Sequence, residues 1–203
     1  MKRNFRYRIG LGLCLLLAAC SSAPMRFYTL VPQGAAPVHT SSGVAYRFAL
    51  LPVTIPAAID QPQLVIRQSD DRMAVLDGER WIAPVDDQIR SAVSDQLQRR
   101  LDTADVYGLP NTGAMPVYRI KLDVQRFESV PGQYASIAAG WSVRSPGGTR
   151  VLACTSRIRE PVDTTGYGAL VRGHQRALQV LADHIATTVQ QLAQGGHADC
   201  PAP

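Results

Sequence analysis

The sequence lacks the common signatures of catalytic and nucleotide-binding sites. Its 203 residues contain no G-x-S-x-G, no H-E-x-x-H, no P-loop and no G-x-G-x-x-G. Histidine is scarce, with four residues, and His174 and His184 lie about three turns apart on one expected helix, too far to share a metal ion there. We therefore expect no enzymatic activity, no cofactor and no metal site.

The chain also lacks an apolar run that could span a bilayer, which takes about 20 helical residues. Its longest candidate, Ile9 to Ala19, has 11 mostly apolar residues. Before it stand Lys2, Arg3, Arg6 and Arg8, without an acidic residue. A basic start, a short apolar middle and small residues at the end are typical of a secretory signal peptide.

The residue after this leader is a cysteine. Leu17-Ala18-Ala19-Cys20 looks like the bacterial lipobox, in which the thiol is diacylglycerylated, the chain is cleaved before it and the new amine receives an acyl chain such as palmitate. We expect a lipoprotein signal peptide at 1–19 and a lipidated Cys20 with a short tether at 20–25. The alternative is an ordinary signal peptide followed by a chance cysteine.

Removal of the leader also removes most of the positive charge. The formal charge of the whole chain is +5, but residues 1–19 hold four of the 21 basic residues and none of the 16 acidic ones. The mature chain would have 17 basic side chains and a net charge of +1. We therefore expect no nucleic-acid partner, and membrane attachment through the lipid alone.

Cysteine is scarce as well, with four residues. Cys14 leaves with the leader and Cys20 is consumed by lipid, so Cys154 and Cys200 remain as an even pair in an oxidising compartment. We predict a disulfide that pins the polar tail 195–203. The alternative is two unpaired thiols, with Cys154 a small buried residue.

The residue pattern predicts a single α+β domain at 26–194. Short strands are expected at 26–31, 46–54 and 63–68, and a hairpin at 72–82 around Asp77-Gly78. From 118 to 159, alternating apolar and polar residues with turns at Pro131-Gly132 and Pro146-Gly148 predict a three-stranded antiparallel meander.

Apolar stripes predict amphipathic helices at 84–101 and 167–193. We expect an antiparallel-rich sheet that ends in the meander, with both helices packed on its apolar face. Trp81 and Trp141 occupy apolar positions and are predicted to lie in the core rather than on a binding surface.

Two segments are candidates for partner binding. The first is a proline- and glutamine-rich turn, which is a rigid loop or a plain connection between strands. Its candidate residues are Ile55, Ile59, Asp60, Gln61 and Gln63. The second is the polar face of the meander, either a flat subunit interface or a solvated surface. Its middle strand carries Ser136, Ala138, Gly140 and Ser142.

Several segments, in order, resemble the ABC-type transport auxiliary lipoproteins of the PqiC (YmbA) type over almost the whole mature chain. These segments are the lipobox, Arg26–Leu30, Leu51–Pro56, Ile59–Arg67, Glu79–Asp87 and parts of the last helix. The resemblance implies a non-enzymatic protein that docks an MCE-domain periplasmic partner in intermembrane lipid transport, as a ring of copies. It also implies the periplasmic face of the outer membrane, which agrees with Ser21 in place of the aspartate that retains lipoproteins at the inner membrane.

Two other functions remain open from the residues alone. One is a lipid-anchored assembly factor or lipid-binding protein of another envelope pathway, such as lipopolysaccharide export. The other is a lipid-anchored hydrolase, which the lack of a nucleophile–base constellation disfavours.

Overall fold

The computed structural model describes residues 24–32, 43–110, 115–148 and 150–201. The predicted signal peptide, Cys14, Cys20 and His39 lie outside these residues. Within them, the domain is α+β as expected, built on two sheets of three and four strands.

The larger sheet has the strand order β2-β5-β6-β7. Its main part is the predicted meander: β5 (Val117–Val130), β6 (Tyr134–Arg144) and β7 (Val151–Pro161) pair antiparallel through long continuous registers. A short 3-10 turn, η2 (Pro146–Gly148), joins β6 to β7. At the other edge, β2 (Arg47–Leu50) pairs parallel with β5, a partnership that local sequence pattern does not reveal.

The smaller sheet has the order β1-β4-β3. Its strands are β1 (Arg26–Tyr28), β3 (Gln63–Arg67) and β4 (Met73–Trp81), with β1 parallel and β3 antiparallel to β4. The predicted hairpin turn at Asp77-Gly78 is wrong. The chain turns earlier, where the Gln68 N–H donates to the Arg72 carbonyl at 2.9 Å.

Asp77 and Gly78 instead lie in a bulge inside β4. Leu64 pairs with Leu76, whereas its neighbour Gln63 pairs with Arg80. Residues 77–79 of β4 therefore lie between these two pairs without a paired residue in β3. A glycine inside a strand often marks such a bulge. The same residue pair that favours a tight turn therefore serves here to re-register a continuous strand.

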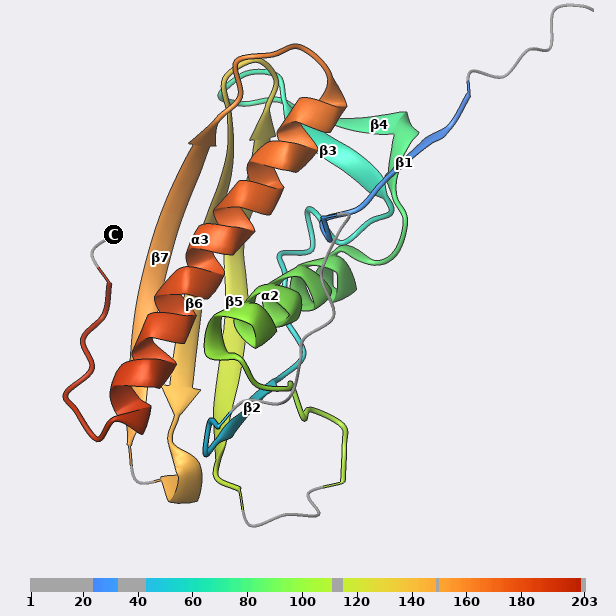
Figure 1. Ribbon diagram of the computed structural model, residues 1–203. Helices are drawn as coiled ribbons and strands as arrows, with labels where there is room; N and C mark the ends of the chain where they lie inside the picture. The colour runs from blue at the N-terminus through green and yellow to red at the C-terminus, as the bar shows by residue number, and fades with distance from the viewer. Residues whose placement is uncertain (1–23, 33–42, 111–114, 149, 202–203) are drawn as a thin grey trace, which may run out of the picture.

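Both helices cover the same face of the larger sheet (Figure 1). They are α2 (Val85–Leu101) and α3 (Tyr167–Ala193), which also contact each other. The helix α2 begins at Val85, one residue later than expected, with Pro84 as its N-cap, and Asp86 and Asp87 occupy its first turn, where the helix dipole favours negative charge. The core lies between the helices and the sheet and includes Trp81 and Trp141, which confirms their predicted burial.

Gly173 lets α3 lie close to the sheet. A Cβ atom at this position would stand 2.9 Å from both the Ala135 Cβ and the Val162 Cγ2, closer than packed carbon atoms come. His174 follows on the same buried side of the helix, so both residues are packed against the upper ends of β5 and β6.

Candidate functional site

The predicted partner-binding loop turns its apolar residues inward. Ile59 is buried in the core and Ile55 packs against it. The turn is closed by the Ile59 N–H, which donates to the Pro56 carbonyl at 3.1 Å. Asp60 is exposed, while Gln61 and Gln63 are half-buried. Of the candidate residues, the polar ones are therefore the accessible ones, and partner binding here stays a prediction.

The outer face of the larger sheet, opposite the helices, is shaped by small residues on its central strand. Ser136, Ala138, Gly140 and Ser142 alternate with the buried residues of β6. Long side chains flank them, since the register places Arg126 of β5 and Arg157 of β7 on either side of Ala138. Two strand spacings put these arginines about 10 Å apart across a shallow trough.

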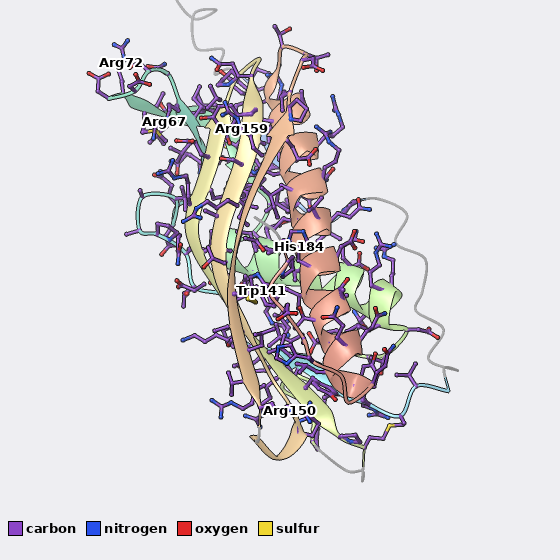
Figure 2. All side chains as sticks on the ribbon, turned by 90° about the vertical axis from the view of Figure 1, so that its left-hand side faces the viewer. Arg67, Arg72, Trp141, Arg150, Arg159 and His184 are labelled. Atoms are coloured by element: carbon purple, nitrogen blue, oxygen red, sulfur yellow. A yellow bond between two sulfur atoms is a disulfide. The ribbon has the colours of Figure 1, made fainter. Side chains whose placement is uncertain are left out.

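The upper part of this trough is a hollow of about 470 Å³ lined by three arginines. We call it the arginine hollow. It is lined by Gln125, Arg126, Glu128, Tyr134, Ser136, Ile137, Ala138, Arg157, Ile158 and Arg159. Figure 2 shows Arg159 at the same end of the sheet as Arg67, with Arg150 at the far end.

The only acid of the arginine hollow is already paired. Glu128 accepts hydrogen bonds from Arg67 of β3 and, at 3.0 Å, from the Tyr134 hydroxyl. Burial opposes the ionised form, but these bonds and the charges of Arg67 and Arg126 outweigh it and lower the pKa of Glu128. Glu128 is therefore ionised at neutral pH and neutralised by Arg67.

The arginines themselves remain available. The Arg159 guanidinium lies 3.4 Å from the centre of the Tyr134 ring, a cation–π contact. In the part of the chain that the structure describes, Arg126 and Arg157 make no hydrogen bond or salt bridge. Converging guanidinium groups suit a carboxylate or phosphate, which they bind by charge-assisted hydrogen bonds. This arrangement can bind an anion, and it offers no general base.

Among the described residues, two serine–histidine pairs lie between α3 and the larger sheet, and neither has the geometry of a catalytic triad. Ser129 Oγ lies 2.8 Å from His174 Nε2, and His174 Nδ1 has no partner among the described residues. Ser156 Oγ accepts from Trp141 Nε1 at 3.0 Å and lies 3.1 Å from His184 Nδ1. Both hydroxyls are buried, and in the described ranges neither ring has a hydrogen bond to a carboxylate. These networks join α3 to the sheet, as Figure 2 shows for Trp141 and His184.

Cys154 and Cys200 are bonded in the structure, with Cα atoms 5.5 Å apart. The bond holds the C-terminal tail against β7, where Arg150 also donates to the Gly196 carbonyl at 3.3 Å. Among the described residues, no three potential metal ligands lie together and no helix has the length and apolarity needed to cross a bilayer.

Sequence reasoning located the small residues of β6 but not the arginine hollow. Its side chains come from β5, β6 and β7, and only the strand register brings them together. The one signal in the sequence was the alternation of Arg157 and Arg159 with buried residues of the last meander strand.

Comparison with known proteins gives one family and a shared fold. The sequence model of the ABC-type transport auxiliary lipoprotein component matches residues 28–186. A crystal structure of an uncharacterized protein superposes with a TM-score of 0.65 at 15% identity and covers 82% of this chain and 99% of its own. The crystal structure of a Xanthomonas campestris protein superposes with a TM-score of 0.60 at 20% identity and covers 85% of this chain and 98% of its own. A search of curated proteins finds no match.

Proposed function

We propose a function from the family to which this chain belongs, the ABC-type transport auxiliary lipoprotein components. In this proposal, the chain is the non-enzymatic docking component of an MCE-type intermembrane lipid transport system. It is anchored through acylated Cys20 to the periplasmic face of the outer membrane and binds the MCE-domain protein as a ring of copies. The family match over most of the mature chain carries this proposal. The lipobox and Ser21 support the anchor and its location.

The architecture supports a binding role over a catalytic one. The two serine–histidine pairs lie between α3 and the sheet, where they join the helix to the strands. The outer face of the sheet, by contrast, offers charged groups at the surface, with Arg126 and Arg157 exposed. Such a face gives specificity and speed to the encounter with an acidic surface. We assign the arginine hollow to the contact with an acidic segment of the MCE partner.

The anchor and the partner can be tested together. Replacing Cys20 in Cys20→Ser is expected to remove the protein from the outer-membrane fraction, because acyl chains supply the attachment. Cys14→Ser is the matched control, since this leader cysteine lies outside the lipobox. Affinity purification of the wild-type protein from solubilised envelopes is expected to recover an MCE-domain protein.

Three results would contradict the proposal. They are a Cys20→Ser protein that remains in the outer membrane, a wild-type protein found in the inner membrane, and recovery of lipopolysaccharide-export proteins in place of an MCE-domain protein. The last result would favour an assembly factor of another envelope pathway.

Charge reversal in the arginine hollow tests the docking surface. The double substitution Arg126→Glu and Arg157→Glu is expected to weaken capture of the MCE-domain protein by about tenfold or more, since like charges across an interface cost several kcal/mol. Quantitative pull-down against a dilution series of the partner measures the change. The control is Arg172→Glu, which reverses an exposed arginine of α3. Equal capture by both variants, at unchanged melting temperature, would place the contact elsewhere.

A further inference from the structure

An exposed apolar surface lies on the smaller sheet, beside the segment that leads to Cys20. We call it the β1–β4 apolar face. It consists of Met25, Phe27, Met73, Val75 and Ile82, all large apolar residues with exposed side chains. Phe27 and Ile82 are the most open, at 56% and 60% exposure. Figure 1 shows β1 and β4 side by side at the margin of the molecule.

The strand register places these residues on one side of the sheet. Phe27 pairs with Arg80 across β1 and β4, and Arg80 pairs in turn with Gln63 of β3. Val65, two residues further along β3, pairs with Val75. Directly paired residues share a face, and so do residues two apart along a strand. Phe27 and Val75 therefore face the same side, and Met25, Met73 and Ile82 follow by alternation.

The opposite side of β1 is fixed to the core. Glu79 accepts hydrogen bonds from the Tyr28 hydroxyl at 2.6 Å and from Arg26 at 2.9 Å. Burial and the bond to Glu79 raise the pKa of Tyr28 to about 12, so the hydroxyl remains a donor at neutral pH. With Tyr28 and Glu79 held inward, Phe27 has no inward position to adopt and stays in solvent.

The distance to the lipid anchor is short. Met25 is five residues after Cys20. An extended chain spans at most about 3.6 Å per residue, so Met25 lies within about 18 Å of the acylated cysteine. A bilayer that holds the acyl chains is therefore the extended apolar surface that this face necessarily approaches.

The charges around the face indicate what kind of contact it makes. Arg80 lies on the same side as Phe27, its strand partner, and Arg72 stands near the face, but so do Asp70, Asp71 and Asp77, which are all exposed. This balance gives no net attraction to anionic lipid. The contact must then come from burial of apolar side chains in the interfacial region, and it does not require a negatively charged membrane.

We propose that the β1–β4 apolar face lies against the bilayer that holds acylated Cys20, with its apolar side chains in the headgroup region. This contact rests on the lipid anchor of the proposed function. It gives the anchored domain a defined orientation, because one side of the smaller sheet faces the lipid.

A fluorescent reporter can test the contact in the full-length lipidated protein. Val75→Cys is labelled with an environment-sensitive nitrobenzoxadiazole dye, and the protein is reconstituted on phosphatidylcholine vesicles. Acylation of Cys20 and the Cys154–Cys200 bond leave the new thiol as the only one in the mature chain. The matched control is Val151→Cys on β7, a strand valine of nearly equal exposure, 51% against 48%.

The expected result is a blue shift of the dye at position 75 on vesicles and a several-fold lower quenching by aqueous iodide, with no change at position 151. The same result is expected on vesicles with and without anionic lipid. In the unlipidated Cys20→Ser protein without vesicles, the dye at position 75 should be as accessible as at position 151.

Each other outcome overturns the contact. Equal quenching at both positions, in protein that floats with the vesicles, refutes the contact and leaves the anchor intact. Shielding of position 75 in the Cys20→Ser protein shows that a second copy covers the face. Protein that fails to float refutes the anchor and, with it, the contact.

Discussion

Lowering the pH from 7 to 4.5 is expected to reduce the free energy of unfolding by about 2.7 kcal/mol through His174 alone, because each pKa unit corresponds to about 1.36 kcal/mol. Burial lowers the pKa of His174 from 6.5 to about 3. The ring is 1% exposed and stacked on Phe127, with ring centres 3.8 Å apart. It therefore stays neutral in the folded protein throughout this range.

The direction of this change in the free energy of unfolding follows from proton binding. Below pH 6.5 the unfolded chain protonates this histidine and the folded protein does not, so acid favours the unfolded state. The loss begins near pH 6.5 and continues until the folded pKa of about 3 is reached. Glu128, whose pKa is lowered from its ordinary value of 4.5, adds an acid-induced loss only at the lower end of this range and below it.

Urea unfolding of the wild-type protein and of His174→Gln, at pH values from 7 to 4.5, measures the effect. Both proteins contain the same other titratable groups, so the difference between their slopes isolates His174. The variant is expected to be less stable at pH 7 and to lose less stability on acidification. Parallel slopes would show that His174 is protonated in the folded state or is reached by water.

Removal of the disulfide is expected to lower the free energy of unfolding by up to about 4 kcal/mol. Cys154 and Cys200 are separated by 46 residues, and the chain-entropy relation assigns a loop of that length about this value. The bond closes α3 and the tail into one loop with β7, so its loss enlarges the unfolded ensemble. It also frees the tail, whose Ala198 is buried.

The double variant Cys154→Ala with Cys200→Ala provides the measurement, by denaturant unfolding without reductant. Alanine keeps the buried position 154 small and apolar. Adding dithiothreitol should lower the stability of the wild-type protein toward that of the variant and leave the variant unchanged. Equal stability of the oxidised wild type and the variant would show that the bond contributes nothing to the stability of the fold.

The parts of the fold that could be predicted from the sequence are those with a clear period. β5 alternates apolar and charged residues from Tyr118 to Val124, and α3 has an apolar stripe that ends at Gly195. Local sequence pattern gave a wrong prediction where one short segment is compatible with two backbone structures. Asp77-Gly78 favours a hairpin turn, but the pairing of Gln63 with Arg80 makes it a bulge.

The candidate site was predicted less completely than the fold. Small residues on β6 could be recognised because they alternate with buried ones. Their basic neighbours could not, since Arg126 and Arg157 are 31 positions apart in the sequence and meet only across Ala138. The loop residue Ile59 was a candidate contact because it is apolar in a turn, and the tertiary structure buries it in the core.

The sequence by itself predicted the leader, the lipobox at Cys20, the near-neutral mature charge and the even pair of remaining cysteines, because each prediction depends on residue identity and order alone. The tertiary structure alone decided which faces are available. It paired β1 with β4 and β2 with β5, enclosed both serine–histidine pairs, assembled the arginine hollow and left the β1–β4 apolar face open. These outcomes depend on contacts between distant segments, which strand register sets and local composition does not encode.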